Sequence, residues 1–276
     1  MKTVSIVTVT FNCKSVIEKT LRSVTTLDYP NFEYIVVDGA STDGTLDVIN
    51  AYREKINHIV SEPDKGIYDA MNKGIALATG DYIAFLNAGD TYYEQDTLKN
   101  VFTSEIMAEN PDVIYGYLIH SFSFGKFVRK RLPLTDFDKY MPIGHPATFV
   151  KTELMKKTPF DCSFRIAADY NFFYNLFKSG AIFRFVNTIV ADFESENGIS
   201  NSPQNAINHI NEIARVNGRI NTFNHQVRRL KLRTKLAIRD IIMPFMQRFF
   251  PSYMTARRVN TIECRPDFIR LKDFKI

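Results

Sequence analysis

The chain has 276 residues, of which 45% are hydrophobic and 24% charged, and its formal net charge is +5. This composition predicts a globular protein with a real core and excludes a disordered chain, while the length suits one large or two small domains. The three cysteines (Cys13, Cys162 and Cys264) are odd in number and far apart, which argues against a disulfide framework or a structural zinc site and favours a reducing compartment.

The N-terminal stretch MKTVSIVTVTFN alternates apolar residues with Ser and Thr and ends at Asn12. It lacks the long apolar core and the cleavage site of a secretory signal, so it indicates a first strand. No apolar run approaches the ~18 residues needed to span a bilayer. We therefore expect a cytoplasmic protein that is soluble or peripheral to the membrane.

The first ninety residues alternate between β-rich runs and segments with helical spacing. The expected strands are Val4–Thr10, Phe32–Val37, Ile56–Val60 and Tyr82–Leu86. The expected helices are one with a capping box at Ser15 and Glu18, then Thr45–Tyr52 and Ile67–Ala78. This alternation predicts an α/β fold with a mostly parallel central sheet and helices on both of its faces.

The stretch VVDGASTDGT, residues 36–45, lies where the second strand is followed by a helix. Gly39 and Gly44 have the outer spacing of a phosphate-binding P-loop, but the lysine of that motif is missing before Thr45. The chain also contains no G-x-G-x-x-G dinucleotide motif. Alone, the stretch is compatible with a nucleotide site, a metal site or a polar turn that caps a helix.

All four expected strands end in polar residues: Thr10 and Asn12, Asp38, Glu62 and Asp64, and Asn87 and Asp90. Ligands of open parallel sheets bind beyond these carboxyl ends, although helix caps alone are an alternative explanation. Carboxylates without lysines suit Mg²⁺ or Mn²⁺, which bridge acidic oxygens to substrate phosphates. Other carboxylates can accept hydrogen bonds from a base or ribose. The sequence therefore predicts a nucleoside diphosphate bound with a metal.

The second half gives weaker signals. Residues 112–120 and 122–128 indicate two β-segments joined near Ser121. Gly144-His145-Pro146 is a rigid turn that presents a histidine, and Asp169 lies at the start of an aromatic-rich helix in IAADYNFF. From the residues alone, both side chains are more simply explained by structural roles.

The C-terminal segment is basic. Residues 219–276 hold 14 Lys/Arg and 4 Asp/Glu, whereas residues 1–218 hold 21 Lys/Arg and 26 Asp/Glu. Apolar residues gather on one side of an expected helix over 224–242, which we expect to end at Pro244. Such a segment suits an anionic membrane surface, or packs on the rest of the protein with a solvated basic face.

Several motifs together resemble family 2 glycosyltransferases, in particular bacterial enzymes that build cell-surface polysaccharides. They are SIVTVTFN, YIVVDGASTDGT, SEPDKGIYDAMNKGIALATGDYIAFLNAGD, GHPATFV and IAADYNFF. The resemblance covers about residues 3–200. It implies a GT-A fold, a nucleotide-sugar donor and transfer with inversion at the anomeric carbon. The implied domains are a GT-A domain over 1–220, with donor half 1–110 and acceptor half 111–220, and a basic amphipathic helical extension over 221–276.

The resemblance also implies site residues. Those that match donor-binding positions are Thr10, Phe11, Asn12, Asp38, Gly39, Asp64, Asp69, Asn72, Asn87, Ala88 and His145. Asn87-Ala88-Gly89-Asp90 stands where the family has its D-x-D-type metal motif, so Asp90 remains as the only charged ligand for Mg²⁺ or Mn²⁺. Met71 stands where many relatives have an arginine.

Asp169 matches the position of the general base, which takes the proton of the attacking sugar hydroxyl. The resemblance places His145 near the donor phosphate or the acceptor. A segment around Gly198 resembles a flexible part that folds over the donor.

We therefore expect an inverting glycosyltransferase that acts on a lipid-linked glycan acceptor at the inner face of the membrane. The alternatives are an inactive glycosyltransferase-like binding protein and a sugar-phosphate nucleotidyltransferase. The nucleotidyltransferase would need a basic, glycine-rich loop that the first strand lacks. A nucleic-acid partner is not expected, because phosphate backbones require cations and not an acidic edge.

Overall fold

The computed structural model describes residues 1–196, 203–249, 258–262 and 264–276. The segment around Gly198 that was expected to fold over the donor lies outside these residues. The helices are α1 (Lys14–Thr25), α2 (Thr45–Asn50), α3 (Ile67–Leu77), α4 (Thr97–Val101), α5 (Ser104–Ala108), α6 (Thr152–Lys157), α7 (Ala168–Lys178), α8 (Pro203–Val216) and α9 (Phe223–Phe249). Short 3-10 turns occur at η1 (Arg53–Lys55), η2 (Leu134–Asp138), η3 (His145–Ala147) and η5 (Leu271–Asp273).

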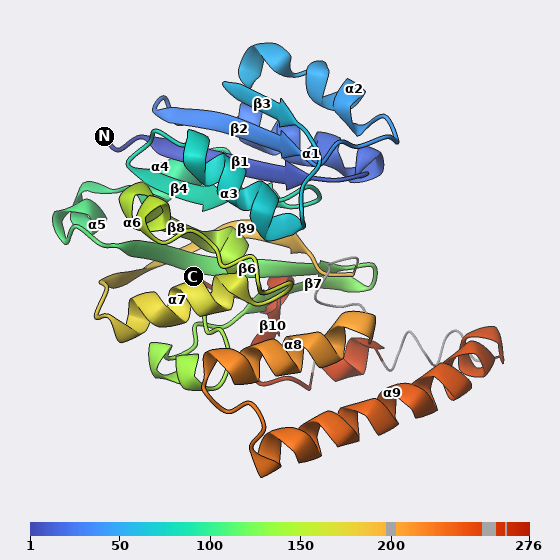
Figure 1. The fold of residues 1–276 in the computed structure, drawn as a ribbon. Helices are drawn as coiled ribbons and strands as arrows, with labels where there is room; N and C mark the ends of the chain where they lie inside the picture. The colour runs from blue at the N-terminus through green and yellow to red at the C-terminus, as the bar shows by residue number, and fades with distance from the viewer. Residues whose placement is uncertain (197–202, 250–257, 263) are drawn as a thin grey trace.

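The strands form one curled sheet (Figure 1). They are β1 (Val4–Thr10), β2 (Phe32–Asp38), β3 (His58–Ser61), β4 (Tyr82–Phe85), β5 (Thr91–Tyr92), β6 (Val113–Phe122), β7 (Gly125–Arg129), β8 (Thr148–Lys151), β9 (Phe183–Glu194) and β10 (Phe268–Arg270). The strand order is β10-β7-β6-β8-β4-β1-β2-β3, and β9 pairs with both β5 and β6.

The expected parallel sheet is confirmed for its first half only. The pairs β3–β2, β2–β1 and β1–β4 are parallel, as the helical connections require. Beyond β4, the pairs of β8 with β4 and β6, and of β7 with β6 and β10, are antiparallel, so the whole sheet is mixed. The β6–β7 hairpin turns at Ser123 and Phe124, two residues later than expected, before Gly125 at φ +148°.

Two layers of helices cover the sheet. Apolar residues of α1, α2 and α4 pack on one face, and those of α3, α6 and α7 pack on the other. Gly74 permits the close approach of α3, since a Cβ there would lie only 2.4 Å from Cγ1 of Val7 on β1. These layers leave the carboxyl ends of β1–β4 together at one edge.

The predicted capping box of α1 is wrong. The helix begins at Lys14 after Cys13, and no side chain of its own caps it. Instead the Asp43 carboxylate accepts the Lys14 N–H at 3.0 Å, and the Thr45 hydroxyl oxygen accepts the Cys13 N–H at 2.9 Å. The cap is supplied by the loop after β2, about 30 residues away, which local spacing could not reveal.

The C-terminal segment differs from the expected helical extension in two ways. Helix α9 continues through Pro244 to Phe249, so the predicted break is wrong; a proline removes one helical hydrogen bond, and that loss does not end this helix. After it, β10 returns to the sheet and pairs with β7, where the Phe268 ring packs edge-on against His120 of β6. Within the described part of the chain, no helix is long and apolar enough to cross a bilayer.

Candidate active site

The polar strand ends come together as the sequence predicted. Thr10 of β1 lies beside Asp38 of β2, which lies beside Ser61 of β3. Backbone hydrogen bonds continue this contact into the loops: Gly39 N–H donates to Thr10 O at 2.9 Å, and Glu62 N–H donates to Asp38 O at 3.0 Å. Asn87 follows β4, the other neighbour of β1. One edge therefore carries the polar residues that close all four parallel strands.

Asp38 is fully buried, and both of its carboxylate oxygens bind the protein. Oδ2 accepts the Ser61 hydroxyl at 2.7 Å and the Ser41 N–H at 3.0 Å, while Oδ1 accepts the Ser41 hydroxyl. In this arrangement Asp38 shapes the loop after β2 and presents no oxygen to a ligand. Its expected direct contact with a base or ribose stays a prediction.

Asn12 also organises this loop. Its backbone φ is +50°, in the left-handed region, and its N–H donates to the Ser41 hydroxyl oxygen at 2.8 Å. Its side-chain oxygen accepts the Thr42 N–H at 2.9 Å. Asn12 thus ties the end of β1 to the loop after β2.

Gly39, Phe11 and Asp64 form an open contact at the same edge. A Cβ on Gly39 would lie 2.4 Å from Asp64 Oδ2 and 3.3 Å from the Phe11 ring, so the missing side chain makes room for the Asp64 carboxylate. The Gly66 N–H holds the other Asp64 oxygen, Oδ1, at 2.8 Å. The Phe11 side chain is 60% exposed. An aromatic surface and a carboxylate oxygen therefore lie side by side.

Asp69 and Asn72 make structural contacts in and before α3. The Asp69 carboxylate accepts the Lys65 N–H at 3.0 Å. The Asn72 amide bonds both the N–H and the carbonyl of Phe160 at 2.9 Å, which joins α3 to the loop before α7. Both residues thus fix segments that border the edge.

The Asn87–Asp90 turn closes with a hydrogen bond from Asp90 N–H to Asn87 O at 2.9 Å and has Gly89 at φ +101°. Ala88 N–H donates to Val9 O at 3.3 Å, which fixes the turn against β1. The Asp90 side chain is only 3% exposed, and its Oδ1 accepts the Glu194 N–H at 3.0 Å. Burial raises the pKa of Asp90 to about 8, against the opposing effects of that hydrogen bond and of Lys19. This carboxyl group is therefore mostly protonated at neutral pH.

Two buried oxygens here are left without a hydrogen-bond partner among the described residues: Asn87 Oδ1 and Thr10 Oγ1. No group of three or more His, Cys, Asp or Glu that could hold an ion occurs in the described ranges. Mg²⁺ is commonly bound by one or two carboxylates together with substrate phosphates and water. Asp90 and Asn87 Oδ1 fit a site of that kind, in which the protein supplies few ligands.

Asp169 forms a second centre beside this edge. Its Oδ1 accepts the Tyr170 N–H at 2.8 Å and lies 3.0 Å from the Tyr68 hydroxyl in the first turn of α3. Its Oδ2 lies 3.7 Å from Nδ1 of His145, beyond hydrogen-bond distance. One carboxylate oxygen is thus held by the protein and the other faces the histidine.

His145 is enclosed by the rings of Phe85, Phe160 and Phe173. Burial lowers the pKa of His145, although the nearby Asp169 carboxylate acts in the opposite direction. The imidazole is therefore neutral at neutral pH. Its Nε2 is buried and has no hydrogen-bond partner in the described part of the chain.

Sequence reasoning missed four residues that arrange these groups. Ser41 and Ser61 hold Asp38, and Tyr68 contacts Asp169. Glu212 of α8 accepts the N–H groups of Arg165, Ile166 and Ala167 just before α7. The register of β3 against β2 places Ser61 opposite Asp38, so pairing these two strands would have revealed Ser61. Nothing in the sequence links Glu212 to the segment from Arg165 to Ala167, which precedes it by between 45 and 47 positions.

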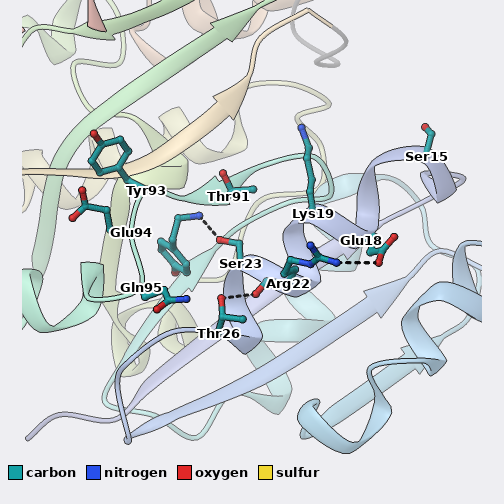
Figure 2. Close-up of a pocket in the computed structure, with 11 residues that line it drawn as sticks. Ser15, Glu18, Lys19, Arg22, Ser23, Thr26, Thr91, Tyr93, Glu94 and Gln95 are labelled. Carbon is teal, nitrogen blue, oxygen red and sulfur yellow. Dashed lines mark hydrogen bonds and ion pairs between the residues drawn. The ribbon is translucent and has the colours of Figure 1, made fainter. Parts of the chain in front are cut away.

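A hollow of about 550 Å³ lies along α1, beside β5 and the segment that follows it (Figure 2). Its lining residues are Ser15, Glu18, Lys19, Arg22, Ser23, Thr26, Thr91, Tyr92, Tyr93, Glu94 and Gln95. None of them is a predicted site residue. The hollow borders the edge at the strand ends, because its lining residue Thr91 directly follows Asp90. The candidate binding and catalytic residues lie at that edge and around Asp169, and not in the hollow.

A family model described as glycosyl transferase family 2 matches residues 5–173. The chain belongs to this family. A PGL/p-HBAD biosynthesis glycosyltransferase of Mycobacterium bovis is 34% identical over 210 residues, which cover 72% of this chain and 79% of that protein. The putative teichuronic acid biosynthesis glycosyltransferase TuaG of Bacillus subtilis is 31% identical over 162 residues, or 58% and 59% of the two chains.

Solved structures of glycosyltransferases share the fold. S. aureus TarS 1-349 in complex with UDP-GlcNAc has a TM-score of 0.61 at 19% identity, covering 90% of this chain and 73% of that one. A mannosyltransferase from Pyrobaculum calidifontis in complex with GDP-Man and Mn²⁺ has a TM-score of 0.59 at 20% identity, covering 78% and 63%. The expected family, the GT-A fold and the glycosyltransferase class of enzyme are confirmed.

The substitution Gly39→Ala tests the contact among Gly39, Phe11 and Asp64. The added methyl group displaces the Asp64 carboxylate from its place beside Phe11. Because a hydrogen bond to a charged group contributes about 1.5–3 kcal/mol, we expect roughly tenfold to hundredfold weaker binding of a nucleoside diphosphate by calorimetry. Asp64→Asn is the matched variant and should lose similar affinity, with little added loss in the double variant. Unchanged affinity of Gly39→Ala would contradict a contact between Asp64 and the nucleotide.

Proposed function

We propose that this protein is an inverting glycosyltransferase of cell-surface glycan synthesis. It moves a sugar from a nucleotide-sugar donor to a hydroxyl group of a glycan acceptor, which we propose is lipid-linked. The observation that carries the proposal is Asp169: one of its oxygens is held by Tyr68 and Tyr170 and the other is left to face neutral His145, next to the strand-end edge. The names of the relatives, which refer to PGL/p-HBAD and teichuronic acid biosynthesis, support a cell-surface product.

The donor base binds at Phe11 and Asp64. The exposed Phe11 ring offers a stacking surface, and Asp64 Oδ2 beside it accepts a hydrogen bond from a ring N–H. Uracil, thymine and guanine carry such a ring N–H in their ordinary forms, whereas adenine and cytosine do not. Asp38 acts through the loop that it holds, and Asn12 secures the same loop.

The donor diphosphate lies over the ends of β1 and β4. Thr10 Oγ1 and Asn87 Oδ1 are buried oxygens there with no hydrogen-bond partner among the described residues, and Asp90 supplies a carboxyl group. Asp90 and Asn87 would hold Mg²⁺ or Mn²⁺, and such an ion would supply positive charge beside the departing diphosphate. Neutral His145 lies beside Asp169, close to where the sugar and the acceptor would meet.

Asp169 is the general base. A sugar hydroxyl is a weak nucleophile, so a positioned carboxylate takes its proton as the new C–O bond forms. Oδ2 is the oxygen for this role, because Oδ1 already accepts the Tyr170 N–H. Inversion requires one such carboxylate, since the nucleoside diphosphate leaves without being protonated.

The second candidate is an inactive glycosyltransferase-like binding protein. The burial of Asp90 and the neutral Asn87 favour it, because both weaken the metal site. Release of free sugar and nucleoside diphosphate from a nucleotide sugar distinguishes the two, since a binding protein without a catalytic base would not hydrolyse the donor faster than buffer does.

Helix α9 supports a peripheral membrane contact on the cytoplasmic side. Among its described side chains, Phe223 and Leu230 are large apolar residues that are 79% and 67% exposed. Exposed cations accompany them at Arg228, Lys231, Arg233 and Lys235. Apolar and basic side chains on one exposed helix suit an anionic lipid surface.

Asp169→Asn keeps the size of the side chain and its ability to accept hydrogen bonds but cannot take the proton. We expect turnover to fall by about a hundredfold or more, as for loss of a general base, with donor affinity within a few-fold of the original. Initial rates and calorimetry measure the two quantities. Asp136→Asn, which changes an aspartate of η2 that belongs neither to the strand-end edge nor to the contacts of Asp169, serves as a control. Near-normal turnover of Asp169→Asn would show that another group is the base.

Asp90→Asn removes the ionisable ligand but resembles the protonated carboxyl of the metal-free protein, so the fold should persist. We expect binding of a nucleoside diphosphate to lose its dependence on Mn²⁺, because an amide is a weak ligand for a hard cation. Asp64→Asn should instead weaken binding both in Mn²⁺ and in EDTA. Calorimetry in the two buffers measures this. Wild-type affinity that EDTA leaves unchanged would contradict a metal site.

The membrane contact is tested by substitution and not by truncation, because removal of residues after 222 would also remove β10 from the sheet. Replacing Arg228, Lys231, Arg233 and Lys235 together by Gln removes about 1 kcal/mol of attraction per charge near an anionic surface. We expect sedimentation with phosphatidylglycerol vesicles to fall at least tenfold, while donor binding stays unchanged. Equal sedimentation of both proteins would overturn the contact, and neutral vesicles provide the control.

A further inference from the structure

Helix α8 holds the backbone that leads to Asp169. The Glu212 carboxylate accepts three successive backbone N–H groups, each at 2.9 Å: Oε1 binds that of Arg165, and Oε2 binds those of Ile166 and Ala167. Ala167 is the residue immediately before α7, and Asp169 lies in the first turn of that helix. Hydrogen bonds from N–H groups to an ionised carboxylate are about twice as strong as neutral ones. The chain is thus fixed two residues before Asp169.

The same segment also contacts α3. The Tyr68 hydroxyl lies 2.6 Å from the carbonyl oxygen of Ile166 and 3.0 Å from Asp169 Oδ1. Glu212 therefore holds the N–H groups of this segment while Tyr68 holds its carbonyl and Asp169 itself. A shift of the segment would move Asp169 Oδ1 away from Tyr68 and change the direction of Oδ2.

A second contact of α8 supports this arrangement one turn further along. The Arg215 guanidinium lies 4.1 Å over the Phe164 ring and donates to the Ser163 hydroxyl oxygen at 2.9 Å. In Figure 1, α8 lies alongside α7, and the two helices are in contact. Residues 163–167 are consequently held by α8 through both a carboxylate and a guanidinium.

We propose that Glu212 is a positioning residue for the transfer reaction, which fixes the general base Asp169 through the backbone of residues 165–167. The proposal rests on the proposed role of Asp169. Glu212 does not contact the substrate in this role; it sets where Asp169 Oδ2 meets the acceptor hydroxyl. A misplacement of about 1 Å can reduce a rate by about a hundredfold, so a group that acts only through the backbone can have a large effect on turnover.

The test is a double-mutant cycle of Glu212→Gln and Asp169→Asn, in which turnover is measured together with the KM of the donor. Glu212→Gln turns one acceptor oxygen into an NH₂ group that opposes the backbone N–H groups. We expect kcat to fall about tenfold to hundredfold, with the donor KM within about twofold. In the Asp169→Asn background the same change should alter kcat less than about twofold, because the base it positions is already lost.

Two further variants keep the result interpretable if Glu212→Gln folds poorly. Glu212→Asp keeps the charge on a shorter side chain and should recover part of the lost turnover. Glu105→Gln, an exposed acid of α5, should leave kcat unchanged. An equal loss from Glu212→Gln in both backgrounds would overturn the positioning role but leave Asp169 as the base. Near-normal turnover of Asp169→Asn alone would instead remove the proposed function of that residue.

Discussion

The edge formed by the carboxyl ends of β1–β4 depends on the buried carboxylate of Asp38. It is fully removed from water at the end of β2, yet it stays satisfied because the two serines Ser41 and Ser61 surround it. A buried carboxylate without such partners would cost several kcal/mol, so the loop after β2 has little freedom to rearrange. Through that loop, Asp43 and Thr45 cap α1. The strand end, the loop and the helix start therefore form one connected unit.

Most acidic groups near the site bind backbone N–H groups of their own protein. Asp43, Asp64, Asp69, Asp90 and Glu212 each accept at least one. This pattern explains how an edge rich in carboxylates avoids strong mutual repulsion, since N–H dipoles balance each ionised carboxylate locally and burial keeps Asp90 mainly protonated. It also leaves few oxygens for ligands, of which Asp64 Oδ2 beside Phe11 and Asp169 Oδ2 beside His145 are the clearest.

The sequence predicted the positions of the polar strand ends, because alternation of strands and helices places them at one edge. It could not predict how each side chain is used there. From the sequence alone, Asp38 was expected to bind a ligand directly. The strand register shows that Ser61 lies beside it and can occupy its carboxylate. Local periodicity does not encode contacts between distant parts of the chain. Such contacts include the cap of α1, the hydrogen bonds that Glu212 accepts before α7 and the pairing of β10 with β7. Likewise, apart from the β6–β7 hairpin, the antiparallel pairs of the sheet join strands that are distant in the sequence.

Two buried ionisable groups, Asp90 at the strand-end edge and His145 beside Asp169, are both mainly neutral at neutral pH. Burial protonates Asp90, whose pKa is raised to about 8, and deprotonates His145, whose pKa is lowered. A divalent cation stabilises an ionised carboxylate, so a cation that bound Asp90 would have to displace its proton. The charge of Asp90 would then appear only together with a bound cation. Since an unpaired charge in this buried edge would destabilise the fold, the burial that keeps Asp90 protonated also keeps the edge stable when no cation is bound.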